Sequence, residues 1–94
     1  MQEAKFLYER EADFLSYDMT LETLASLSNR LRALNAETVA DRNHFATASR
    51  DIDRALDTLR RDLADFPYPQ FEIGLRLYFL DVAERAEKVL AANA

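Results

Sequence analysis

The scarcity of turn-forming residues is the feature that most constrains how this chain can fold. The chain of 94 residues contains one glycine and two prolines, and both prolines lie in one short stretch, as Pro67 and Pro69. Sandwiches, barrels and phosphate-binding loops need glycine and proline at many turns, so these folds are excluded. The length fits one domain over residues 1–94. The sequence therefore predicts a single all-α domain.

Two breaks divide the chain into three helical segments. The stronger break is Phe66-Pro67-Tyr68-Pro69, because each proline disfavours helix in the residue before it. The weaker break is Asn35–Thr38, where Thr38 opens a stretch with the spacing of a capping box. Short loops join antiparallel neighbours. We therefore expect an antiparallel helical bundle with three long helices over about residues 3–35, 38–65 and 69–93.

A third possible break lies at residues 16–20, which are rich in capping residues but contain no glycine or proline. Phe14, Tyr17 and Leu21 keep their helical spacing across these residues, which favours one continuous first helix. A four-helix arrangement, with a break near residues 16–20, stays open as the alternative.

Apolar residues at alternating steps of three and four mark one face of each segment as its buried face. The predicted core positions are Leu24, Leu31, Ile52, Leu59, Val82 and Ala86.

Charge and hydropathy exclude several classes of partner. The formal net charge is −5, and no third of the chain carries more basic than acidic residues, so we expect no nucleic-acid binding. No apolar run approaches the length of a membrane span, so we expect no membrane partner. Charged residues follow the first methionine closely, which argues against a secretory signal and predicts a cytoplasmic protein.

The sequence offers little catalytic chemistry. His44 is the only histidine, and together with Asp41 it supplies half of a metal motif at most. The carboxylate pairs lie on polar helix faces, where solvated charge is expected. The serines have no histidine at a plausible spacing and no glycine-flanked turn that would expose one as a nucleophile. We therefore expect no enzyme activity, no metal and no cofactor.

Excess apolar residues, in contrast, predict a contact surface. Besides the core stripe, the first and third helices each carry a second apolar stripe, and both stripes would lie at one end of the bundle. The predicted partner-binding residues are Tyr8, Leu15, Met19, Ile73, Leu77 and Leu80.

Three interpretations of these stripes stay open. They could become core if the first helix breaks near Asp18 and folds back into a four-helix bundle. They could meet across the two-fold axis of a homodimer. They could instead bind an amphipathic helix of another protein. Gly74, which lies beside Ile73, lacks a side chain and would let another helix approach closely.

Two stretches carry a resemblance to a known family. They are Leu24–Ala33, and Arg76–Leu80 followed by Lys88-Val89-Leu90 and the ending Leu90-Ala91-Ala92-Asn93. In these stretches the chain resembles the FlaF-type flagellar regulators and the helical flagellin-export chaperones. The resemblance implies a helical bundle that binds a secreted flagellar subunit or tunes its synthesis.

Taken with the stripes, this gives the expected function: a non-catalytic helical bundle, of chaperone or regulator type, that binds a helical protein partner. The alternative is a structural protein that assembles with other copies of itself.

Overall fold

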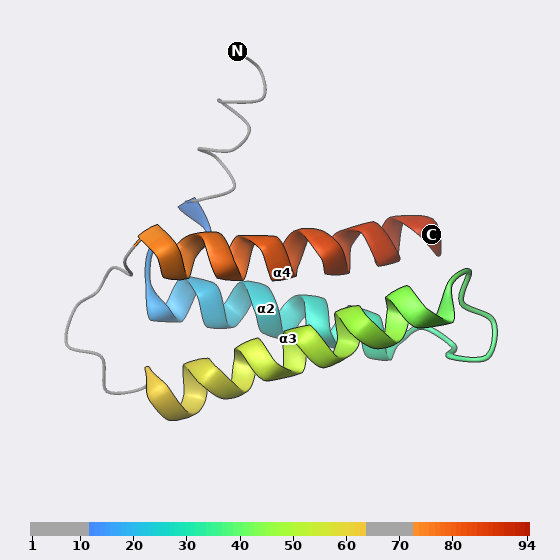
Figure 1. Ribbon diagram of the computed structural model, residues 1–94, viewed down its shortest axis with the longest axis horizontal. Coiled ribbons are helices and arrows are strands. Elements are labelled where there is room, and N and C mark those ends of the chain that lie inside the picture. Colours follow the sequence, from blue (N-terminus) through green and yellow to red (C-terminus); the bar gives the residue numbers. More distant parts are fainter. Residues whose placement is uncertain (1–11, 64–72) are drawn as a thin grey trace, which may run out of the picture.

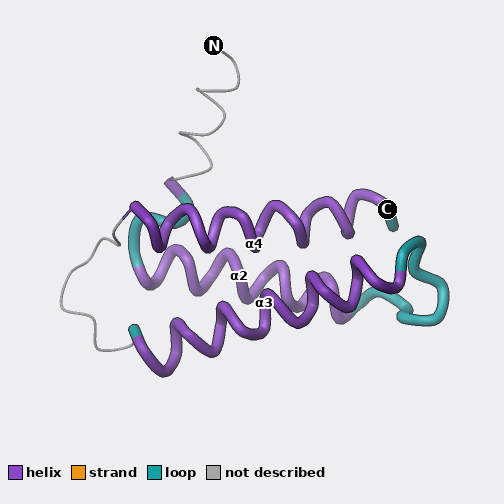
Figure 2. Tube along the Cα trace, in the orientation of Figure 1, coloured by secondary structure: helices purple, strands orange, loops and turns teal. Residues whose placement is uncertain are grey.

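The computed structural model describes residues 12–63 and 73–94. Its helices are α2 (Tyr17–Arg32), α3 (Arg42–Asp62) and α4 (Ile73–Ala92). Each helix packs against both of the others. α2 and α4 run in the same direction and α3 runs in the opposite direction (Figure 1). The described parts of the chain contain only helix and loop (Figure 2). The prediction of an all-α antiparallel bundle is confirmed.

The core lies along the common axis of the three helices. All six predicted core positions are buried, with at most 1% of each residue exposed: Leu24, Leu31, Ile52, Leu59, Val82 and Ala86. Burial of one large aliphatic side chain stabilises a fold by about 1.5–3 kcal/mol. The three-and-four spacing therefore identified the residues that hold the bundle together.

The prediction of one continuous first helix over residues 3–35 is wrong, because the chain turns just before the alternative break predicted near residues 16–20. The additional helix of the four-helix alternative lies outside the described residues. Residues 13–16 form a turn, and α2 begins only after it. Ser16 adopts an extended conformation, and its hydroxyl accepts a hydrogen bond from the Met19 backbone N–H at 3.3 Å, which caps the helix. Phe14 is fully buried in the core although it lies in the turn. Its burial explains why the apolar spacing continues across the break. The expected helix at residues 3–11 lies outside the described residues.

The second helix starts later than predicted, at Arg42 rather than residue 38. Asp41, not Thr38, is the N-cap, because its carboxylate accepts a hydrogen bond from the His44 backbone N–H at 3.1 Å. Thr38 belongs to a turn instead, in which its N–H donates to the Asn35 carbonyl at 3.0 Å. α3 ends at Asp62, three residues before the predicted end at 65. The predicted start of the third helix at residue 69 lies outside the described residues, and its end at Ala92 is one residue before the predicted end.

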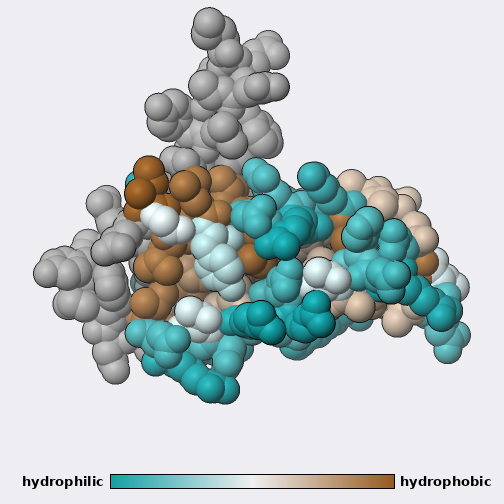
Figure 3. All heavy atoms as spheres, viewed as in Figure 1, coloured by the Kyte–Doolittle hydropathy of each residue, from teal (hydrophilic) through white to brown (hydrophobic). Residues whose placement is uncertain are grey.

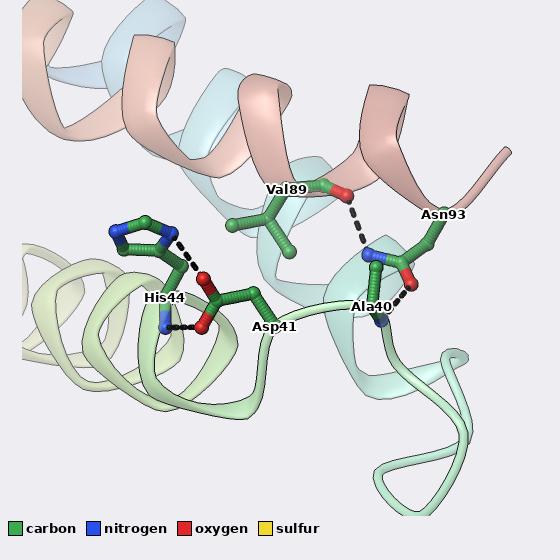
Figure 4. Close-up of polar contacts among 5 residues, drawn as sticks. All are labelled: Ala40, Asp41, His44, Val89 and Asn93. Atoms are coloured by element: carbon green, nitrogen blue, oxygen red, sulfur yellow. Dashed lines mark hydrogen bonds and ion pairs between the residues drawn. The ribbon is translucent and has the colours of Figure 1, made fainter.

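Polar contacts fasten the helices to one another at their ends and edges. Asn93 joins the end of α4 to the loop before α3: its side-chain oxygen accepts from the Ala40 N–H, and its side-chain nitrogen donates to the Val89 carbonyl, both at 2.8 Å (Figure 4). Arg85 on α4 pairs with Asp51 on α3 at 3.3 Å. The Asn93 contacts close the end of the bundle where α4 finishes and α3 begins, and the Arg85–Asp51 pair joins the two helices farther along.

Candidate interaction surface

The exposed large apolar side chains of the described residues gather at one end of the molecule. The exposed fractions are 42% for Met19, 61% for Ile73, 49% for Leu77 and 38% for Tyr78. All four residues lie in the first two turns of α2 or α4. Because α2 and α4 run in the same direction, their first turns share one end of the bundle (Figure 1).

The beginning of α4 presents a continuous apolar face, which we call the α4 face and define as Ile73, Gly74, Leu77 and Tyr78. At about 100° per residue, these four positions span an arc of roughly 140°. All four are exposed to solvent. Brown, apolar atoms gather over the start of α4, whereas the surface farther along the helix is mostly polar (Figure 3).

Leu80 does not belong to this surface, and its assignment as a contact residue is corrected by the structure. Only 4% of Leu80 is exposed, and it packs in the hydrophobic core. The physical reason is that α4 contacts both α2 and α3, so it buries a wider arc than a helix with one neighbour would bury. Leu80 lies on the edge of that wider arc.

The predicted contact residues of the first segment are dispersed. Tyr8 lies outside the described residues, and Leu15 is partly buried in the turn before α2. Met19 is exposed, but it lines a shallow hollow of about 450 Å³ whose other lining residues include Asp13, Glu22 and Glu87. Arg30 lines the same hollow, so Met19 has charged surroundings, unlike the α4 face. The structure brings Ile73 and Leu77 together and leaves Met19 on the flank of α2.

His44 contacts the residue that caps the start of α3. Its side chain is 80% exposed, and its Nδ1 lies 2.9 Å from an Asp41 carboxylate oxygen, while the backbone N–H of His44 is bound by the same carboxylate (Figure 4). Asp41 and His44 line a hollow of about 370 Å³ beside Lys88 and Val89 of α4. Among the described residues, no three metal-ligating side chains come together.

Gly74 is the residue of the α4 face whose surroundings the sequence alone could not show. A Cβ atom built on Gly74 would meet nothing within 4 Å, apart from the local helix backbone. Neighbouring helices of the same chain therefore do not require a glycine there, although glycine inside a helix costs up to about 1 kcal/mol relative to alanine. Among the residues that the structure describes, nothing fills the space above Gly74.

Asn93 also has a larger role than sequence reasoning assigned to it. Its position at the end of a helix is typical of residues that bind the last carbonyl groups. The sequence gives no sign, however, that its second contact is with Ala40, 53 positions earlier in the chain.

Comparison of the chain with known protein families, with curated proteins and with solved structures finds no match. None of the helices in the described ranges combines the length and the apolar character that a membrane span requires. The candidate surface therefore has to be interpreted from its own chemistry.

Proposed function

We propose that this chain is a non-catalytic helical bundle that binds another protein through the α4 face, and that the partner contributes a helix. One observation carries the proposal: three large apolar side chains lie exposed together on the first two turns of α4, at Ile73, Leu77 and Tyr78. The buried core includes none of them.

A helix is the element that fits this face best. The face extends over two turns of α4 and is about as wide as one helix. An amphipathic helix places apolar residues at steps of three and four on one side, so its stripe matches such a face. Covering exposed apolar area lowers the free energy of a complex by about 25 cal/mol for each Å² that is removed from water. The resemblance to flagellar chaperones suggests a helix of a secreted flagellar subunit as the first partner to test.

A photo-crosslinking experiment in cells of the source organism tests this function. A photoreactive amino acid replaces Leu77 in one variant and Asn43 in a control variant. Asn43 is exposed in the first turn of α3, at the opposite end of the bundle. We expect one dominant protein adduct at position 77 and none at position 43. Equal adducts at both positions, or none at position 77, would refute the proposed binding face.

A second copy of this chain is the other candidate partner. It is favoured by the charge of the α4 face, because none of its four residues is charged. Such a face can meet its own copy without repulsion.

A further inference from the structure

We infer that the α4 face pairs with the same face of a second copy, so that two α4 helices cross at Gly74 in a weak two-fold dimer. The inference rests on the proposed function, because it names a partner for the same face. It draws on the shape, the charge and the area of that face.

The shape of the α4 face is self-complementary. Leu77 projects from the surface, with 49% of it exposed, and Gly74 leaves open space one turn away on the same face. In a two-fold contact, a residue i of one copy that touches residue j of the other implies that residue j of the first copy touches residue i of the second. Leu77 of each copy can therefore fill the space above Gly74 of the other, and the missing side chain allows the two helix axes to approach closely.

The charge around the face permits this contact although each chain has a net charge of −5. A two-fold contact brings identical groups close together, so any uncompensated charge near its centre would repel its own copy. Arg76 is the only charged residue from Ile73 to Leu80. It lies roughly 130° around the helix from the centre of the α4 face. Asp81, the next charged residue along α4, lies one turn beyond Leu77 and pairs with Arg85 at 2.7 Å, a cation that it shares with Asp51 at 3.3 Å.

The area of the face sets the strength of the dimer. Ile73, Leu77 and Tyr78 are 61%, 49% and 38% exposed. At roughly 150–250 Å² for a complete large side chain, they expose on the order of 300 Å² per copy. A stable interface buries about 800 Å² on each partner. The dimer should therefore dissociate on dilution.

The test measures the mass of the full chain in solution by sedimentation, at concentrations from about 10 µM to about 1 mM, where a contact of this size should dissociate. We expect the average mass to rise with concentration from 10.8 kDa toward twice that value. Leu77→Asp should weaken the association at least about tenfold, because it replaces the apolar side chain that fills the space above Gly74 by a charge and adds two like charges to one small contact.

Two further variants separate the interface from general effects. Asn43→Asp adds the same charge at the far end of the bundle and should leave the association unchanged. Gly74→Leu fills the open space and should weaken the association about as much as Leu77→Asp, whereas the circular dichroism spectrum should stay helical because no described residue occupies that space. A spectrum that has lost its helical signal would show that the space above Gly74 belongs to the fold and would overturn the inference.

A cysteine variant gives a second measurement, because a disulfide traps the associated state covalently. The chain contains no cysteine, so Gly74→Cys creates a single thiol. We expect oxidation to link Gly74→Cys into a disulfide dimer much faster than Asn43→Cys, because the two-fold contact brings the two thiols together.

Three results would overturn the inference: a constant mass of 10.8 kDa up to about 1 mM, an association that Leu77→Asp and Asn43→Asp weaken equally, or equal rates of disulfide formation at the two positions. A monomer at every concentration would leave the proposed function intact if position 77 still crosslinks to another protein. The failure of the inference and the failure of the function are therefore distinguishable.

Discussion

Thr20 is a polar residue in an apolar environment. It is fully buried in the core, and its hydroxyl oxygen has no hydrogen-bond partner among the described residues. A buried polar group without a partner costs about 1–3 kcal/mol, because it gives up its hydrogen bonds to water and gains none in return. Thr20 therefore lowers the stability of a core that is otherwise almost entirely apolar.

Replacing this hydroxyl group by a methyl group should stabilise the protein. We expect Thr20→Val to raise the free energy of unfolding by about 1 kcal/mol, because valine has the same shape and removes the unsatisfied hydroxyl. Thr20→Ser keeps the hydroxyl, loses a methyl group and should lower the free energy of unfolding by about 1 kcal/mol. Urea unfolding measures both values. A loss of stability in Thr20→Val would show that the hydroxyl is bonded.

The contrast between Leu77 and Leu80 shows what residue patterns can and cannot predict. Both leucines lie in the second apolar stripe of the third helix, yet one is half exposed and the other is buried. The pattern placed both leucines on one stripe of the helix. It could not show how far the core extends around α4, because that depends on where α2 and α3 lie.

At the scale of the elements, local capping decides where the helices begin. Periodicity placed the helices and their core faces correctly, as Leu24 and Ile52 show. It missed the break before α2, because Phe14 reaches the core from a turn and keeps the helical spacing. It also placed the start of α3 four residues early, because Thr38 and Asp41 are both good capping residues and only the fold chooses between them.

The choice of cap for α3 can be measured. We expect Asp41→Ala to lower the free energy of unfolding by about 1 kcal/mol, because the His44 N–H loses its acceptor. Thr38→Ala should change it by less than about 0.5 kcal/mol, because Thr38 is exposed in the loop. Thermal or urea unfolding of the two variants tests this. A larger loss from Thr38→Ala would place the start of the helix at residue 38 after all.

At the scale of the whole molecule, the two ends of the bundle differ. The end where α4 finishes is closed by Asn93, which binds the loop before α3. The end where α4 begins exposes the α4 face (Figure 3). This asymmetry is the basis of the proposed function. The two stripes predicted which end of the bundle carries the excess apolar residues. Which of these residues are exposed depends on how α4 packs against both neighbours, and the sequence did not show this.

The central claim is that the α4 face belongs to the exposed surface of the bundle and not to its hydrophobic core. Urea unfolding of Leu77→Asp and Leu80→Asp, followed by circular dichroism at low protein concentration, tests it most directly, because the two leucines lie one turn apart on the same helix. We predict that Leu77→Asp keeps its helical spectrum and loses less than about 1.5 kcal/mol of unfolding free energy. Leu80→Asp should lose more than about 3 kcal/mol or fail to fold, because it buries a charge. If Leu77→Asp unfolds the bundle as Leu80→Asp does, the face is core and the claim is contradicted.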